Sequence, residues 1–261
     1  MESAGAMAER SVQIPIPPFS IQGKLTLPEQ ARGLILLAQG SAASRPSRRD
    51  RLVLDALVEA RIGNARLDLI MRDEGEVDEN THLLWSDIHF LAGRLVIATD
   101  WLAREAETGQ LPLGYLGAGA SAAVALAAAA ARSAAVRAVV SRCGRPDLIE
   151  PALRTVNTPT LLIVRGADRD EVRVNRRAMD AIAATDKELR VIPPSTRPLG
   201  ERGATEEMAR ITREWFVRFL PSQSDHPVAP VPDPRMTADA RAANGTLTGP
   251  CLQPDEAATV R

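Results

Sequence analysis

The sequence predicts an α/β fold with three layers, in which a mostly parallel sheet carries helices on both faces. Short apolar runs alternate along the chain with longer segments that repeat apolar residues at helical spacing. The runs in the middle of the chain are largely apolar, which is typical of strands buried on both faces of a parallel sheet. The length of 261 residues suits one such domain.

The chain opens with a predicted flexible leader at residues 1–10, followed by a hairpin. The strands of this hairpin are expected at 11–16 and 21–27, where β-branched and alternating residues flank Pro17 and Pro18. Because proline has no backbone N–H to donate, we expect the hairpin to lie at an edge of the sheet.

Strands and helices are expected to alternate after this hairpin. Strands are predicted at the apolar runs 33–38, 64–70, 111–116, 136–141, 158–164 and 188–192. Helices are predicted where apolar residues recur at helical spacing, at 49–60, 85–105, 121–131, 172–183 and 205–219. The acidic segment 72–81 is expected to be a solvated loop.

The predicted domain spans residues 11–220, and the composition changes after it. Pro, Ser, Asp, Thr and Gly dominate residues 221–261, and the apolar periodicity ends. Such a segment buries too little apolar surface to offset the entropy lost on ordering, so it is predicted to be a disordered tail.

Composition and charge exclude several classes of function. The formal net charge is −1 with acidic and basic residues interspersed, so no nucleic-acid partner is expected. No apolar run approaches the roughly 18 residues of a membrane span, and the N-terminus has no apolar signal region. The two cysteines, Cys143 and Cys251, are far apart and fit a reducing compartment. We therefore expect a cytoplasmic protein without a membrane partner, a cofactor or a metal.

A small-residue turn joins the strand 111–116 to the helix after it. The turn reads Gly-Ala-Gly-Ala-Ser at 117–121. The pattern Gly-x-Ser-x-Gly places a strained serine nucleophile on a turn of this kind, which is called a nucleophile elbow. Here Gly119 stands at the serine position and Ser121 at the last glycine position. We expect a positive φ at Gly119 and an elbow without a nucleophile.

A set of segments beyond the elbow points to a family through its order and spacing. The segments are 33–41, 67–69, 98–102, 114–118, 139–142, 144–148, 159–164 and 215–216. With them the chain resembles the dienelactone-hydrolase-like group of small α/β-hydrolases, including members associated with phosphoribosyltransferases, from about Gly33 to Leu220. The resemblance implies the α/β-hydrolase fold. It also implies a nucleophile, an acid and a histidine at successive strand ends, with small esters, lactones or acyl compounds as the substrate class.

Transferred residue by residue, this catalytic pattern is broken. The nucleophile position is Gly119, the acid is retained as Asp168, and the histidine position holds Arg197. Glycine has no hydroxyl, and a guanidinium with a pKa above about 12 cannot accept a proton at neutral pH. Asp168 and Arg197 either form an ion pair that replaces the Asp–His hydrogen bond or remain two solvated charges.

The resemblance also assigns a substrate and oxyanion region. Gln39 replaces the usual histidine before Gly40, and Ser41 and Ala120 complete this region. A small-molecule ligand in the remaining cleft is compatible with these residues, and no protein partner is identified.

Two interpretations remain open. In the first, the chain has lost hydrolase activity and serves as a binding or regulatory module. In the second, it is an active ester or lactone hydrolase with a relocated nucleophile. Ser121 and Cys143 are the two candidates for that role. Ser121 is otherwise expected to bond backbone N–H groups at the start of the helix, and Cys143 to be an incidental thiol.

Overall fold

The computed structural model describes residues 8–39, 46–71, 74, 83–193 and 200–221. Chain contacts divide the protein into two compact units, Met1–Asp225 and His226–Arg261, and every described residue belongs to the first unit. The predicted tail, apart from Pro221, therefore lies outside the described residues, as do residues 1–7 of the predicted leader.

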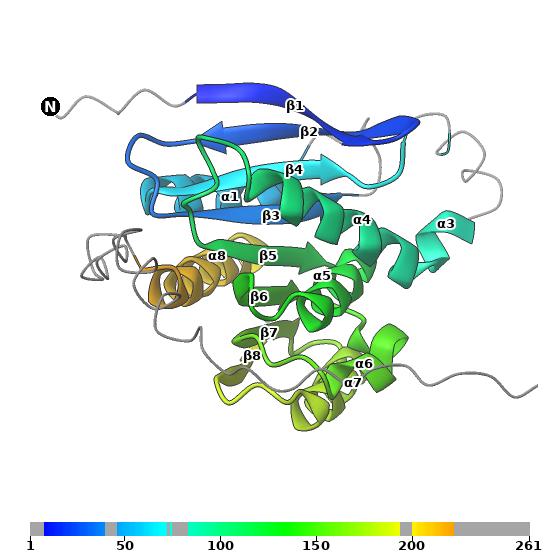
Figure 1. Ribbon diagram of the computed structural model, residues 1–261. Helices are drawn as coiled ribbons and strands as arrows, with labels where there is room; N and C mark the ends of the chain where they lie inside the picture. The colour runs from blue at the N-terminus through cyan, green and yellow to red at the C-terminus, as the bar shows by residue number, and fades with distance from the viewer. Residues whose placement is uncertain (1–7, 40–45, 72–73, 75–82, 194–199, 222–261) are drawn as a thin grey trace, which may run out of the picture. The chain divides into compact units, whose positions relative to one another are not determined.

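Eight strands form one sheet in the order β1-β2-β4-β3-β5-β6-β7-β8 (Figure 1). The strands are β1 (Ala8–Ile16), β2 (Phe19–Leu27), β3 (Gly33–Gln39), β4 (Ile62–Asp68), β5 (Leu113–Ala118), β6 (Val136–Arg142), β7 (Thr160–Arg165) and β8 (Lys187–Ile192). Strand β2 is antiparallel to both β1 and β4, and all other neighbours are parallel. The mostly parallel sheet and the edge hairpin are therefore confirmed.

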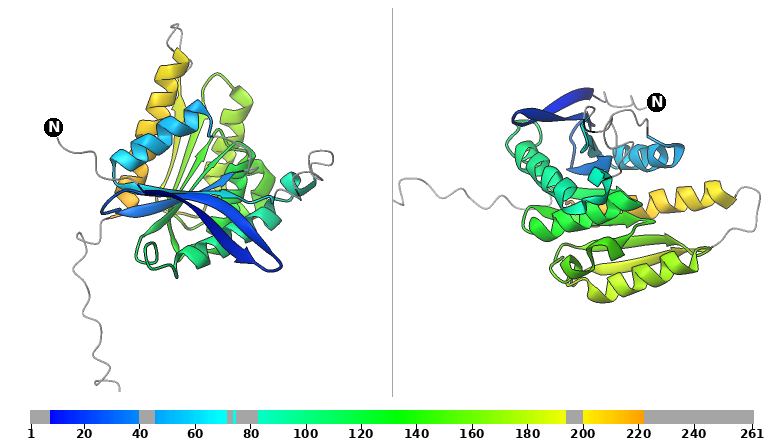
Figure 2. Two further views of the ribbon diagram at one scale, coloured as in Figure 1. Left: turned by 90° about the horizontal axis from the view of Figure 1, so that it is seen from above. Right: turned by 90° about the vertical axis from the view of Figure 1, so that its right-hand side faces the viewer.

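Helices cover both faces of this sheet (Figure 2). They are α1 (Arg48–Glu59), α3 (Leu83–Ser86), α4 (Ile88–Leu102), α5 (Ala120–Ala131), the 3₁₀ turn η1 (Pro146–Ile149), α6 (Glu150–Leu153), α7 (Arg169–Ala181) and α8 (Gly200–Phe219). Helices α1 and α8 pack on one face, and α4, α5 and α7 pack on the other. This arrangement confirms the three-layer α/β fold.

Strand β3 shows how the apolar runs build two cores at once. Leu34 and Leu36 contribute to the core under α4 and α5, whereas Ile35 and Leu37 contribute to the core under α1 and α8. Because successive side chains of a strand point to opposite faces, a strand between two helical layers must be apolar at every position.

Five elements differ from the sequence-based expectation. Strand β1 begins at Ala8, so residues 8–10 belong to the sheet and not to the predicted leader. The single helix expected at 85–105 is two helices, because the Asp87 carboxylate accepts the Phe90 N–H (2.9 Å) and caps a new helix. The short elements η1 and α6 were not predicted; η1 begins with Pro146 and α6 has Pro151 as its second residue, and proline is tolerated in a first helical turn.

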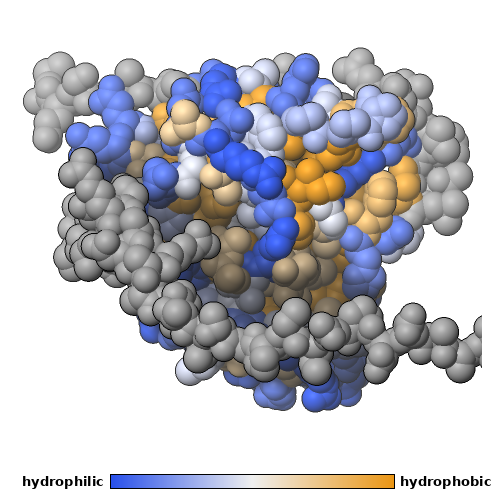
Figure 3. Space-filling model, in the orientation of Figure 1, coloured by the Kyte–Doolittle hydropathy of each residue, from blue (hydrophilic) through white to orange (hydrophobic). Residues whose placement is uncertain are grey.

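The acidic segment 72–81 is described only at Glu74, and that residue is not simply solvated. Its carboxylate forms a two-point ion pair with Arg94 on α4, with both N···O distances at 2.6 Å. The Arg94 guanidinium also lies over the Phe90 ring, 4.2 Å from its centroid. Figure 3 shows that apolar residues gather on this face between polar side chains, and Phe90 and Ile97 are exposed on α4.

Candidate functional site

The turn between β5 and α5 has the geometry of an elbow. Gly119 is the N-cap of α5, with φ 60° and ψ −126°, so the predicted positive φ is confirmed. Residues with a Cβ rarely adopt this conformation. A Cβ at Gly117 would lie 2.4 Å from the Ser121 carbonyl oxygen, so only glycine allows the chain to turn so sharply there.

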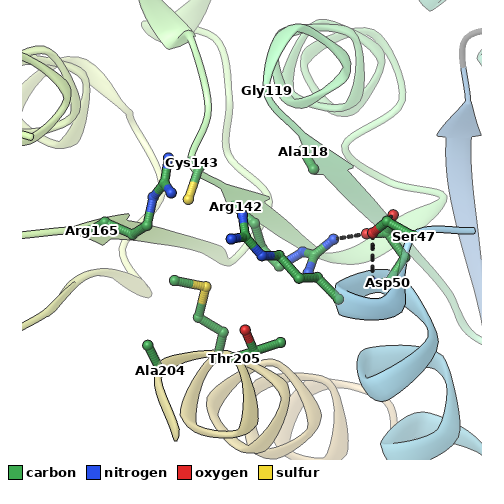
Figure 4. A pocket seen from close by; sticks show the side chains of 11 residues that line it. Ser47, Asp50, Ala118, Gly119, Arg142, Cys143, Arg165, Ala204 and Thr205 are labelled. Carbon is green, nitrogen blue, oxygen red and sulfur yellow. Dashed lines mark hydrogen bonds and ion pairs between the residues drawn. The ribbon is translucent and has the colours of Figure 1, made fainter. Parts of the chain in front are cut away.

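Open space lies above the apex of this turn. A Cβ built on Gly119 would meet no heavy atom within 4 Å. Gly119 lines a cavity of about 400 Å³, which is enclosed by the start of α1, the ends of β5, β6 and β7, and the first turns of α8 (Figure 4). A side chain at position 119 would project into this cavity, and the sequence provides none.

A partly buried ion pair crosses the cavity wall. The Arg142 guanidinium at the end of β6 donates to the Asp50 carboxylate in the first turn of α1 (Figure 4). The Ser47 hydroxyl also donates to Asp50 (2.7 Å), and the Asp50 N–H donates back to the Ser47 hydroxyl (3.1 Å). Burial opposes ionisation of Asp50, but the Arg142 charge and these hydrogen bonds outweigh it, so the pKa of Asp50 lies below its ordinary value.

The Cys143 thiol reaches the same cavity from the end of β6 (Figure 4). Burial raises the pKa of Cys143, the nearby Glu171 carboxylate raises it further, and the Arg165 charge only partly opposes them. A thiol with a raised pKa is mostly protonated at neutral pH and is a poor nucleophile. Of the three histidines in the sequence the structure describes only His89, which is exposed on α4 and does not line the cavity.

Ser121 is used by the turn itself. Its hydroxyl donates to the Ala118 carbonyl (2.9 Å) and accepts the Ala118 N–H (3.1 Å). It does not line the cavity, which Ala118 and Gly119 reach. Ala120 is the first residue of α5.

Asp168 caps helix α7. One carboxylate oxygen accepts the N–H groups of Asp170 (3.0 Å) and Glu171 (2.9 Å). The side chain is exposed and lines a second cavity of about 350 Å³, which shares Cys143 with the first. Asp168 therefore lines the second cavity, whereas Gly119 lines the first.

Several residues from the sequence-based site lie beyond the described ranges. Gly40, Ser41 and Arg197 are outside them, so the expected pairing of Arg197 with Asp168 stays a prediction. Gln39 ends β3, with its backbone in register with Asp68 of β4. Within the described ranges no cluster of His, Cys, Asp and Glu could hold a metal, and none of the helices is long and apolar enough to cross a membrane.

Sequence reasoning missed the charged residues that line the cavity. Arg142 and Arg165 end the neighbouring strands β6 and β7, each after an apolar run. Functional groups of parallel sheets gather at the carboxyl ends of strands, so this position was a usable signal. Asp50, whose partner is 92 residues away, gave no such signal.

Comparison with known proteins finds similar proteins named phosphoribosyl transferases and a similar structure named dienelactone hydrolase. No family model matches the chain. Two Mycobacterium tuberculosis proteins, named "Putative phosphoribosyl transferase Rv0571c" and "Putative phosphoribosyl transferase MT0597", are each 39% identical over 214 residues. The match covers 82% of this chain but 47% of each relative, so the chain spans about half of their length.

The similar solved structures include a dienelactone hydrolase. The crystal structure of dienelactone hydrolase from Anabaena variabilis is 40% identical, covers 82% of this chain and 98% of its own, and superposes with a TM-score of 0.76. Est1E from Butyrivibrio proteoclasticus shares the fold at 11% identity, with a TM-score of 0.64 over 80% of this chain and 98% of its own. The fold, the strand order and the 40% identity together place this chain in the dienelactone-hydrolase-like family of α/β-hydrolases.

Proposed function

We propose that this chain has no serine-hydrolase activity and serves as a binding or regulatory module built on the hydrolase fold. The observation that carries the proposal is Gly119, which occupies the apex of the elbow, faces an open cavity and carries no nucleophilic group of its own. Serine-hydrolase chemistry needs a hydroxyl at this apex and a base beside it. Arg197, at the histidine position, cannot act as that base.

Neither candidate for a relocated nucleophile suits the task. The Ser121 hydroxyl is engaged by Ala118 on both its donor and acceptor sides. Cys143 has a raised pKa, and no described histidine lines either cavity beside it. The Asp168 carboxylate is bound to the backbone of α7, where it stabilises the helix.

A module that binds a small molecule in the cytoplasm is the form of this proposal that fits the observations best. The cavity above Gly119 has a volume in the range of small-molecule sites, and Cys143 is a free thiol, as expected in a reducing compartment. Because the matched region is 47% of the Mycobacterium tuberculosis relatives, the module accompanies further sequence in those proteins. A regulatory role beside a second domain is therefore part of the proposal.

Ester hydrolysis tests the proposal directly. The purified chain should hydrolyse p-nitrophenyl acetate and butyrate no faster than a control protein of similar surface composition, and a fluorophosphonate probe should not label it. Oxyanion-hole and binding effects alone can leave a rate about 10³-fold above water, so a weak signal is compatible with the proposal. A rate that Ser121→Ala or Cys143→Ala abolishes would contradict it.

The second candidate function is an active ester or lactone hydrolase. It is favoured by the retained Asp168 and by the 40% identity to a protein named dienelactone hydrolase. The same experiment separates the two functions, since an active enzyme must lose its rate when its own nucleophile is replaced.

A further inference from the structure

We infer that two copies of this chain associate through the outer face of α4, around a two-fold axis near Gly93. Phe90, Gly93 and Ile97 define this face, because residues three and four positions apart share one side of a helix. Phe90 is 37% exposed and Ile97 is 43% exposed. None of the three lines the cavity above Gly119, so association can be tested apart from the function proposed above.

The outer face of α4 carries no exposed charge. The one charged residue between positions 88 and 99 is Arg94, whose side chain is 8% exposed and is engaged by Glu74 and by the Leu69 carbonyl. A helix that is apolar on its outside as well as its inside is ordinarily covered on both sides. Figure 3 shows apolar side chains gathered over this part of the molecule.

Helix α7, on the same face of the sheet, shows the ordinary pattern. Its solvent side carries exposed charged residues of both signs, namely Arg169, Asp170, Arg173, Arg176, Arg177 and Asp180. The apolar outer face is therefore a property of α4 and not of this whole layer of helices.

Gly93 lies in the interior of α4, where glycine destabilises a helix relative to alanine. A Cβ built on it would meet no heavy atom within 4 Å, so the packing of the described chain does not require a glycine there. What glycine does provide is room for another backbone to approach closely. Gly93 also stands midway between Phe90 and Ile97, at the place where a second helix would cross.

This spacing is complementary to a second copy of itself. When two α4 helices cross antiparallel at Gly93, Phe90 of each copy lies against Ile97 of the other, because the two residues are about 5 Å to either side of the crossing point. The two contacts are equivalent, as a two-fold interface requires. A second copy of this chain therefore fits the face at both ends at once.

The polar residues beside this face are also complementary in such a pair. His89 and Asp100 are eleven residues apart, close to three full turns, so they lie along the same side of α4. Antiparallel pairing brings His89 of each copy next to Asp100 of the other. The Asp100 side chain is 34% exposed and accepts from Arg132 (2.5 Å). An imidazole is neutral or positive, so it can donate to this carboxylate and does not repel it.

The size of the face sets the expected strength of association. Helix α4 has 15 residues, a length of about 22 Å. One helix pair of this length buries less than the roughly 800 Å² per partner of a standard interface, so we expect a reversible dimer at high micromolar concentration. At the low micromolar concentrations of denaturant melts the chain should be monomeric, and substitutions at Gly93 then act on the isolated fold.

Sedimentation velocity of the full chain tests the inference, from about 1 to 500 µM under reducing conditions. The sedimentation coefficient should rise from that of a monomer toward that of a dimer. Ile97→Lys should weaken association at least tenfold, because the introduced charge would lie against the apolar Phe90 of the other copy. Val191→Lys is the matched control, since Val191 is similarly exposed, at 39%, on the edge strand β8, and it should associate like the native chain.

Disulfide trapping tests the antiparallel register. In Gly93→Cys the two introduced thiols face each other across the axis and should cross-link on mild oxidation. In Ile97→Cys the two thiols are separated by about 10 Å along the helices, beyond the Cα separation of about 7 Å that a disulfide tolerates. Gly93→Cys should therefore cross-link at least tenfold faster, and the native chain, with Cys143 and Cys251, provides the background.

Each opposite result overturns the inference. A chain that stays monomeric at 500 µM would leave the face to another partner, such as a further domain of the kind of length that the Mycobacterium tuberculosis relatives possess. A dimer that Ile97→Lys does not weaken would use a different surface. Species that grow beyond a dimer would exclude a closed two-fold contact, and cross-linking of Ile97→Cys as fast as Gly93→Cys would exclude the register. None of these results bears on ester hydrolysis.

Discussion

The ends of β5 and β7 hold the positions where the family resemblance predicts a nucleophile and an acid, and the structure uses the two positions differently. At the end of β5, the backbone retains the sharp turn of an elbow, with φ 60° at Gly119, but no reactive group stands on it. At the end of β7, the carboxylate of Asp168 is still present, but it accepts two N–H groups of α7 and serves as a helix cap. The end of β5 therefore has the backbone turn of an elbow but no reactive side chain, whereas the end of β7 has a carboxylate that stabilises a helix.

This difference shows that each feature has a structural role that does not depend on catalysis. The β5 turn must join a buried strand to a buried helix, so its tight backbone is needed whether or not a nucleophile stands there. A carboxylate at a helix N-terminus stabilises the helix even without a histidine partner. Both features are therefore compatible with a protein that no longer hydrolyses esters.

The end of β6 lies between these two strand ends, and its ion pair gives the largest expected effect. Arg142→Ala should lower the free energy of unfolding by about 2–3 kcal/mol, because it leaves the partly buried Asp50 carboxylate without its partner. The double variant with Asp50→Asn should recover part of the loss. Urea denaturation of the four proteins measures the coupling, and additive losses would show that the pair contributes no net coupling.

The same pair predicts a dependence on pH. Because the pKa of Asp50 is lower in the folded chain than in the unfolded one, its contribution is complete above the unfolded value of about 3.9 and is lost as the pH falls through the folded value. The native chain should therefore lose stability more steeply below about pH 4 than Asp50→Asn does. Parallel pH profiles of the two proteins would contradict this prediction.

The variant Gly119→Ser tests whether the turn at the end of β5 imposes a strained backbone conformation. A serine would have room in the cavity but would be held at a positive φ, so we expect a loss of about 1–3 kcal/mol in stability. Gly93→Ser is the matched control, since Gly93 lies in α4, also has open space around it and has an ordinary φ. If both variants behave alike in denaturant melts, the turn stores no elbow strain.

Substitutions of Asp168 test whether this carboxylate, at the end of β7, serves only as a helix cap. Asp168→Ala should cost about 1 kcal/mol of stability, because two N–H groups of α7 lose their acceptor. Asp168→Asn keeps an oxygen acceptor and should cost only a few tenths of a kcal/mol. If the asparagine variant is as unstable as the alanine variant, the negative charge itself has a partner, and Arg197 becomes the residue to replace next.

Ser121→Ala should give the smallest effect. The hydroxyl loses two hydrogen bonds to Ala118 at a partly exposed site, so a loss of about 0.5–1 kcal/mol is expected. The rate of p-nitrophenyl butyrate hydrolysis should not change. A change in that rate with unaltered stability would assign Ser121 a chemical role and not a structural one.

Local sequence patterns determined much of this fold. The apolar run of β3 and the small-residue turn after β5 predicted a buried strand and a positive φ at Gly119, and both are confirmed. Such features depend on residues that are close in sequence, where side-chain periodicity and glycine chemistry act directly. The break at Asp87 also had a local signal, an acidic N-cap, but the apolar periodicity that continues past it concealed it.

The composition of the cavity was decided only by the tertiary structure. Asp50 and Arg142 are separated by 92 residues and meet because α1 packs on the same face of the sheet as α8, at the carboxyl end of β6. The sequence analysis placed the start of the following helix at residue 172, and only the structure, in which α7 begins at Arg169, shows that Asp168 caps it. Pairings of this kind depend on the order of the strands and the packing of helices from distant parts of the chain, and no local window of the sequence contains that information.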